Sequence, residues 1–377
     1  MTELTRKFDE SLLSKSNHER LLSFKDSRII HPKLVNVLNT LMPWATEPLA
    51  TQIIFVPGPS GVGKTTLLDI FEQKLVKYFL PKMDEDPGII PVVRIEADPP
   101  HANGLFSWSN FYIKILQKLN EPLAGTVANR LRADELRRAM HKALHYRKTK
   151  VLIVDEAQSI GLVSAGRRLS DQMDNLKNLF NLTGVIIVLV GTYELLKLRE
   201  LSGQIGRRSI REDFSRYHNK YLNSQNEGQP EFNDLETFRD ILLEFQRRLP
   251  VQSMPDLMSH FDYMYIHSIG CTGILKDWLT RALYRSLNEN KNTVTLGHLK
   301  QTALDSSICI QLLNEAKYGE ESFLREQAFE DELLHTCFPN GKPDEPEKSA
   351  STIDSSPKSK KRTPGKRKPK RDKVGEV

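Results

Sequence analysis

The chain has 377 residues, of which 39% are hydrophobic and 27% are charged, an ordinary composition for a globular protein. No apolar run approaches the roughly 20 residues that a membrane-spanning helix needs, so we expect no membrane partner. Residues 1–20 are polar and mixed in charge, which argues against a signal peptide. The three cysteines form no CxxC pair, so neither a disulfide framework nor a zinc site is expected, and a reducing cytoplasm is the default.

The net charge of +6 is concentrated in one segment. Residues 339–377 contain 12 Lys and Arg against 6 Asp and Glu, so they carry the whole excess and the rest of the chain is neutral. This segment is rich in Pro, Ser, Lys and Arg and too poor in apolar residues to fold alone. The sequence therefore predicts a disordered basic tail that seeks a polyanion or an acidic partner.

Helices at the N-terminus come before the first strand signal. The apolar positions Leu34, Val35, Leu38, Leu41 and Met42 have helical spacing, and we expect Pro43 to end this helix. Short, continuously apolar strands then alternate with helices, which indicates an α/β fold with a parallel sheet covered on both faces. The expected strands are residues 53–56, 92–96, 151–154 and 185–190; the expected helices begin at Gly63 or Lys64 and cover 109–119 and 128–144.

Beyond Gly191 the patterns are almost entirely helical. Apart from a short strand near Phe214, helices are expected over 238–249, 273–287 and 296–313, followed by an acidic amphipathic helix. The predicted organisation is an N-terminal helical extension (1–45), a nucleotide-binding α/β core (46–203), a helical lid (204–314), the acidic helix (315–338) and the basic tail (339–377).

Residues 58–65, Gly-Pro-Ser-Gly-Val-Gly-Lys-Thr, fit the phosphate-binding pattern G-x-x-x-x-G-K-[ST] between a strand and a helix. Glycines let successive N–H groups point at phosphate oxygens, and the helix N-terminus adds partial positive charge. Lys64 would contact the β- and γ-phosphates of ATP, and the Thr65 hydroxyl would bind Mg²⁺. The expected ATP-binding residues are Gly58, Pro59, Ser60, Gly61, Val62, Gly63, Lys64, Thr65 and Thr66.

A second motif follows about ninety residues later, where the apolar run 151–154 ends in Asp155 and Glu156. Asp155 would bind the Mg²⁺ ion with its water shell, and Glu156 would polarise the attacking water as general base. Strands often end in solvated acids, so the pair is informative because it accompanies the phosphate loop. The adjacent acids favour ATP hydrolysis over nucleotide binding alone.

Three further positions are candidates for the same chemistry. Thr192 follows a strand, and ligands bind at the carboxyl ends of strands, so it could sense the γ-phosphate or the lytic water. Arg207 and Arg208 could reach the nucleotide of a neighbouring subunit as an arginine finger, or form a solvated basic loop. Lys276 could contact nucleotide from the helical lid, or be an ordinary surface lysine.

These motifs together resemble the AAA+ ATPases, and in detail the TnsC/TniB branch, the ATPase regulators of DNA transposition. The resemblance covers residues 25–310 and is carried by the segments 26–32, 92–97, 105–106, 115–119, 155–158, 190–192 and 270–275. It implies an AAA+ fold and an ATP-dependent homo-oligomer, a ring or filament on duplex DNA with about six or more subunits per turn. It also implies transposase partners and a target selector, such as a CRISPR effector or a TniQ-type adaptor, in a bacterial cytoplasm.

Two segments are candidates for DNA contact. Thr126 precedes a helix containing Arg130, where exposed N–H groups would suit a phosphate, and the family resemblance places this helix start against DNA. A plain capped helix with a solvated basic face is the alternative. The tail residues 358–371 could be a DNA-binding arm, a docking peptide for the transposase, or a nuclear localisation signal in a eukaryotic host.

Two other functions remain open at this stage. A replication initiator or clamp loader of the AAA+ type usually carries a winged helix after the lid, for which residues 315–377 leave no room. A signalling ATPase that binds a protein partner and no nucleic acid is the other alternative.

Overall fold

The computed structural model describes residues 5–47, 53–99, 106–122, 130–162, 169–200, 206–219 and 234–337. By its contacts the chain divides into one compact unit, Met1–Arg325, and a second unit from Glu326 onward. The predicted basic tail 339–377 lies outside the described residues, so its disorder stays a prediction. None of the described helices is long and apolar enough to cross a bilayer.

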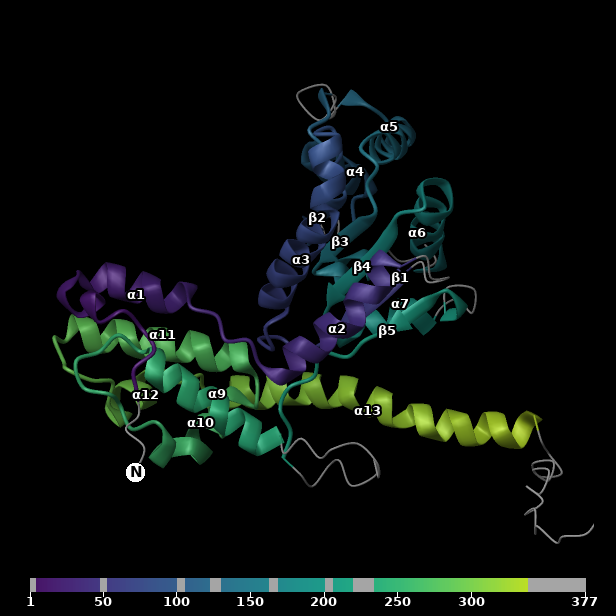
Figure 1. Cartoon of the computed structure of the whole chain (residues 1–377). Helices are drawn as coiled ribbons and strands as arrows, with labels where there is room; N and C mark the ends of the chain where they lie inside the picture. The colour runs from purple at the N-terminus through teal and green to yellow at the C-terminus, as the bar shows by residue number, and fades with distance from the viewer. Residues whose placement is uncertain are drawn as a thin grey trace, which may run out of the picture. The chain divides into compact units, whose positions relative to one another are not determined.

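A five-stranded parallel sheet forms the centre of the compact unit, with strand order β2-β3-β4-β1-β5 (Figure 1). The predicted parallel α/β sheet is therefore confirmed. Four strands lie within one residue of their predicted bounds, and the fifth lies just before Phe214. The strands are β1 (Ile53–Pro57), β2 (Val92–Glu96), β3 (Val151–Asp155), β4 (Ile186–Gly191) and β5 (Ser209–Arg211).

Apolar side chains cover both faces of this sheet. Because successive strand residues point to opposite faces, Ile53 and Phe55 belong to one core while Ile54 and Val56 belong to the other. The first core is closed by α4 (Trp108–Lys118), α5 (Ala133–Tyr146) and α6 (Leu169–Thr183), and the second by α2 (Pro32–Thr46) and α3 (Lys64–Glu85).

The prediction that Pro43 ends the N-terminal helix is wrong, because α2 continues to Thr46 with Pro43 inside it. Proline removes one N–H donor from the helix, but its carbonyl still accepts the N–H of Glu47 at 2.9 Å. Burial of Leu41 and Ala45 on either side of Pro43 in the second core holds this last turn in place. Tertiary packing therefore outweighs the local preference.

A third core belongs to the helical part of the chain. It joins α9 (Asp234–Arg248), α10 (Phe261–Ser268), α11 (Thr272–Asn288) and α12 (Leu296–Thr302), with Trp278 fully buried among them. Phe24 of α1 (Asn17–Asp26) is buried in the same core. The N-terminal extension therefore divides, α1 packing with the helical part and α2 with the sheet.

The expected boundary between the helices 296–313 and 315–338 is wrong. The break lies earlier, between α12 and a single helix α13 (Ser306–Cys337). The Asp305 carbonyl accepts the N–H of Cys309 at the start of α13, and aspartate is a preferred residue just before a helix. The remaining short helices are α7 (Leu196–Glu200), η1 (Glu10–Ser14), η4 (Ala157–Gly161), η5 (Tyr193–Leu195) and η7 (Met258–His260).

Candidate nucleotide-binding site

The predicted phosphate loop lies between the end of β1 at Pro57 and the start of α3 at Lys64. Gly61 and Gly63 have φ angles of +76° and +111°, a left-handed backbone region that side chains disfavour. A Cβ on Gly58 would come within 2.5 Å of the Phe214 carbonyl oxygen. The loop therefore needs these glycines, and it leads directly into the N-terminus of a 22-residue helix, where anions are stabilised.

Lys64 is folded into this loop. Its ammonium donates to the carbonyl oxygens of Gly58 at 3.1 Å and Pro59 at 3.0 Å, and the side chain is buried. Burial lowers the pKa of Lys64, while the negative charges of Glu156 and Asp155 oppose that shift. The loop thus holds a buried cation that is stabilised by the negative charges of the two acids at the end of β3.

The two acids lie at the end of β3, which is separated by β4 from β1, the strand before the phosphate loop. Asp155 is the last residue of β3, and Glu156 turns the chain with a φ of +50°. The Glu156 N–H donates to Asp155 Oδ1 at 2.9 Å. Burial raises the pKa of Asp155, and the Glu156 N–H and the Arg94 charge act against that rise. The left-handed turn directs the chain into η4 immediately after the acids.

Arg94 is a contact of Asp155 that the sequence reasoning did not single out. Its guanidinium lies 3.4 Å from Asp155 Oδ2 and 2.6 Å from Asp69 Oδ1 of α3. An arginine between the apolar strand residues Val93 and Ile95 was the signal available in the sequence. Arg94 therefore fixes Asp155 between β2 and α3.

Gln158 joins two of the predicted catalytic residues. Its Nε2 donates to Glu156 Oε2 at 2.6 Å, and its Oε1 accepts the Thr192 N–H at 3.1 Å. Thr192 directly follows β4, whose last residue, Gly191, also accepts the Gly58 N–H at 3.1 Å. The structure thus brings the ends of β1, β3 and β4 together around the phosphate loop.

The helical part contributes backbone and hydroxyl contacts to the loop that were not predicted. The Ile274 N–H donates to the Gly61 carbonyl oxygen at 3.1 Å, and Thr272 Oγ1 donates to the Val62 carbonyl oxygen at 2.9 Å. A Cβ on Gly273 would lie 2.5 Å from the Gly61 oxygen. The first turn of α11 therefore packs directly on the phosphate loop.

Lys276 lies one turn farther along α11, where its ammonium donates to the Ser27 carbonyl oxygen at 2.5 Å. Burial lowers the pKa of this ammonium. In this structure Lys276 ties α11 to the segment between α1 and α2. A role as a nucleotide sensor stays a prediction.

Arg207 and Arg208 directly precede β5, and both are exposed. The Arg208 carbonyl oxygen accepts the N–H of Ile53, the first residue of β1, whereas the phosphate loop follows the last residue of that strand. The two ends of β1 are separated by roughly 13 Å. Both arginines therefore begin at the edge of the sheet opposite the phosphate loop of their own subunit.

The predicted DNA contacts are placed only in part. Thr126 lies outside the described residues. The prediction that Arg130 lies within the helix is wrong, because α5 begins at Ala133, and Arg130 is exposed just before it.

Two pockets open along the carboxyl edge of the sheet. One, of about 490 Å³, is lined by Arg94 and Asp155 with Glu72, Ile95, Glu96, Lys114, Gln117 and Lys118. The other, of about 520 Å³, is lined by Ser60, Gln158 and Thr192 with Pro59, Tyr193, Glu194, Lys197, Asn314, Glu315 and Tyr318. Of the predicted site residues, Asp155, Pro59, Ser60 and Thr192 thus border open space at this edge.

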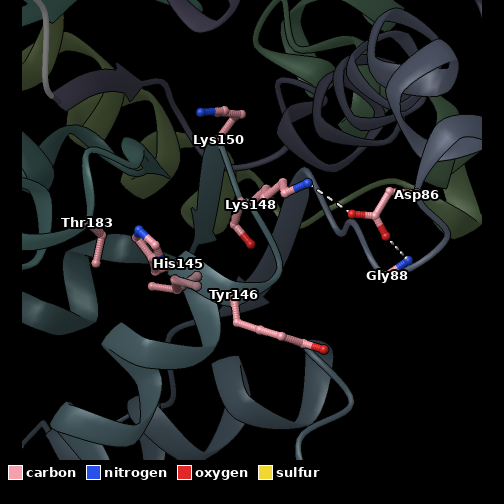
Figure 2. A pocket seen from close by; sticks show the side chains of 9 residues that line it. Asp86, Gly88, His145, Tyr146, Lys148, Lys150 and Thr183 are labelled. Carbon is pink, nitrogen blue, oxygen red and sulfur yellow. Dashed lines mark hydrogen bonds and ion pairs between the residues drawn. The ribbon is translucent and has the colours of Figure 1, made fainter.

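A third pocket, of about 460 Å³, lies at the opposite edge, where the chain enters β3. Figure 2 shows Lys148 turned toward Asp86, with which it forms a 3.0 Å ion pair, and Lys150, His145 and Tyr146 nearby. The Lys150 N–H donates to the Pro91 carbonyl oxygen just before β2, which locates this pocket at the amino ends of the strands. It is therefore separate from the phosphate loop.

The residues at the carboxyl edge fit a nucleotide with Mg²⁺. The buried Lys64 ammonium, the glycine backbone and the helix N-terminus are complementary to phosphate. The exposed Thr65 and the Asp155 carboxylate supply hard oxygen donors. The described part of the chain contains no group of three or more His, Cys, Asp or Glu that could hold a metal ion.

The buried carboxyl group of Asp213, just after β5, should make the free energy of unfolding depend on pH. Burial raises its pKa to about 7 from 3.8, although the Tyr193 hydroxyl donates to it at 3.0 Å. Because the folded state favours the protonated acid, this stabilisation is complete below about pH 4 and is lost as the pH rises through 7. The unfolding free energy should therefore fall by about 2 kcal/mol between pH 5 and 8 on this account.

Asp213→Asn should remove that dependence, which urea unfolding at pH 5, 6, 7 and 8 would measure. Burial lowers the pKa of His31 to about 4 and that of His218 to about 3, so both act in the opposite direction at acid pH. The wild-type protein and Asp213→Asn both keep these histidines. The difference between their curves of unfolding free energy against pH therefore isolates the contribution of Asp213. Parallel curves would contradict the assignment.

Comparison with known proteins agrees with this geometry. Residues 49–198, which contain the phosphate loop, both acids and Thr192, match the family described as the AAA domain. No curated protein matches the chain in sequence.

Two solved structures from Aeropyrum pernix share the fold. The ORC1 protein in complex with DNA is 15% identical, with a TM-score of 0.51 over 76% of this chain and 68% of that one. The ORC2 protein in ADPNP–ADP complexes is 13% identical, with a TM-score of 0.50 over 74% and 70%. The chain therefore has the AAA+ P-loop NTPase fold, and the match to the AAA domain covers residues 49–198 of it.

Proposed function

We propose that this protein is an Mg²⁺-dependent ATPase that assembles on duplex DNA and controls a DNA transposition reaction. The ATPase assignment is carried by one observation. The Lys64 ammonium is buried in a glycine loop, where the negative charges of two strand-end acids act on it, and the Gln158 side chain links one of these acids to the end of β4.

Each residue has a defined role in this proposal. Lys64 and the loop N–H groups bind the phosphates, and Thr65 and Asp155 hold the metal, which when bound neutralises phosphate charge. Glu156 accepts the proton of the attacking water, and Thr192 contacts and orients the γ-phosphate. Arg94 holds the Asp155 carboxylate through their 3.4 Å contact.

The DNA-binding part of the proposal rests on the charge distribution and on the resemblance to the transposition regulators. The tail 339–377 carries the whole net charge of +6, and Arg130 is exposed. The oligomer, the transposase and the target selector are proposed on the resemblance alone. An ORC-like replication initiator is the second candidate, favoured by the fold shared with the two Aeropyrum pernix ORC proteins.

Fluorescence anisotropy of a labelled duplex tests the DNA-binding proposal. We expect binding that requires Mg²⁺ and ATP and weakens with salt, with a log–log slope of about −0.9 per phosphate neutralised. Removing 339–377 should reduce that slope while leaving the ATPase rate nearly unchanged. Preference for one defined sequence would favour the initiator, and no DNA binding under any condition would favour a signalling ATPase.

Arg207→Ala should slow ATP hydrolysis by about 10- to 100-fold, since a charged hydrogen bond contributes roughly 1.5–3 kcal/mol. Because Arg207 begins at the edge opposite its own phosphate loop, we propose that it acts on a neighbouring subunit's nucleotide. Mixing Arg207→Ala with Glu156→Gln, which still binds ATP, should then restore activity, because the Arg207→Ala subunit keeps a complete nucleotide site and the Glu156→Gln subunit supplies the arginine. Arg208→Ala tests the other candidate arginine, and a mixture no more active than its components would contradict action in trans.

A further inference from the structure

We propose that Gln158 is a positioning residue for ATP hydrolysis. Its amide links the general base Glu156 to Thr192, the residue proposed to contact the γ-phosphate. This inference rests on the proposed ATPase function and assigns a role to a residue outside the motif pattern. Gln158 lies in η4, two residues beyond Glu156, and its side chain spans from one strand end to another.

The orientation of the Gln158 amide follows from its partners. A backbone N–H can only donate, so the Thr192 N–H must face the amide oxygen, at 3.1 Å. The amide nitrogen then faces Glu156 Oε2 at 2.6 Å, and a carboxylate can only accept. Each partner therefore fixes the same orientation, and the amide connects Glu156 to the backbone after β4.

Gly191 shows that this space is reserved for the amide. A Cβ on Gly191 would lie 2.2 Å from Gln158 Oε1 and 3.3 Å from the backbone nitrogen of Gln158. Gly191 does not have a positive φ, so the requirement is for space and not for backbone freedom. The close approach of β4 to η4 thus depends on a residue without a side chain.

The two hydrogen bonds of the Gln158 amide form a bridge between the Glu156 carboxylate and the end of β4, which would lie beside the γ-phosphate. Glu156 has a left-handed backbone conformation, which side chains disfavour, and its carboxylate lies in the half-buried edge of the sheet. With Gln158 in place, a shift of Thr192 is transmitted to the carboxylate through two hydrogen bonds. Without it, the carboxylate can rotate away from the direction of attack, and the rate falls while nucleotide binding persists.

Three substitutions perturb the bridge in different ways. Gln158→Met keeps the side-chain length and removes both hydrogen bonds. Gln158→Glu keeps the acceptor for the Thr192 N–H and replaces the donor to Glu156 with a like charge. Gly191→Ala leaves Gln158 chemically intact and displaces its amide, because the new methyl group would meet Oε1.

Single-turnover ATP hydrolysis by the full-length protein, with Mg²⁺ and with and without duplex DNA, tests the proposal. We expect all three variants to lower the rate by about 10- to 100-fold, while the Kd for a fluorescent ATP analogue changes less than about twofold. Equal loss of rate and nucleotide affinity would overturn the proposal in favour of a structural role. Wild-type rates in Gln158→Met and Gly191→Ala would also overturn it.

A double-mutant cycle with Glu156→Gln makes the assignment specific. If Gln158 acts through Glu156, then Gln158→Met should not slow the Glu156→Gln protein further. An additive loss would show that Gln158 acts independently and would overturn the coupling. Absence of hydrolysis by the wild-type protein would instead refute the proposed ATPase function, so the two failures are distinguishable.

Discussion

Glu156→Gln should bind ATP as the wild-type protein does and hydrolyse it about 10²- to 10⁴-fold more slowly, the usual contribution of a general base. The substitution keeps the side-chain shape and an oxygen that accepts the Gln158 amide, so the bridge to Thr192 is retained. Only the proton acceptor is lost. The expected signature is a lower kcat with little change in nucleotide Kd, measured by phosphate release and by nucleotide titration.

The nearby acid provides a contrast to this variant. Asp155→Asn should raise the Mg²⁺ concentration for half-maximal nucleotide binding, because Asp155 is the proposed metal ligand, whereas Glu156→Gln should leave that concentration unchanged. Normal turnover by Glu156→Gln would remove Glu156 from the general-base role.

Lys64→Ala should abolish nucleotide binding under ordinary assay conditions. It removes the cation that faces the phosphates and leaves the carbonyl oxygens of Gly58 and Pro59 without their donor. We expect a loss of affinity of at least about 100-fold, roughly 3 kcal/mol, because hydrogen bonds to charged groups are among the strong ones.

Thermal unfolding separates loss of binding from loss of folding in this variant. Saturating ATP at about 100 times its Kd should stabilise the wild-type protein by about 2.7 kcal/mol and leave the Tm of Lys64→Ala unchanged. Lys74→Ala is the matched control, an exposed lysine on the same helix. A full ATP-induced Tm shift in Lys64→Ala would contradict the site assignment.

The parts of this site that lie in local sequence could be predicted. The phosphate loop, the two acids and the strand before Thr192 are each signalled within about ten residues, because a buried parallel strand is continuously apolar and a phosphate turn requires glycine. The apolar patterns fix which segments form strands. They also place the strand ends at one edge.

The contacts between distant segments could not be predicted in this way. Thr272 meets Val62 across 210 residues, and nothing local to either position marks the contact. Gln158 is a single polar residue in a short helix, and only the arrangement of β3 beside β4 gives it two partners. The continuation of α2 past Pro43 likewise depends on burial of its last turn, which a local proline rule ignores.

Nucleotide-dependent assembly on DNA is the central claim, and negative-stain electron microscopy of the full-length protein with duplex DNA tests it most directly. We expect rings or filaments on DNA with Mg²⁺ and ATP or a slowly hydrolysed analogue, fewer without nucleotide, and none with Lys64→Ala. Monomers in every condition, from a protein that binds ATP normally, would contradict assembly on DNA and leave a nucleotide switch that acts on a protein partner.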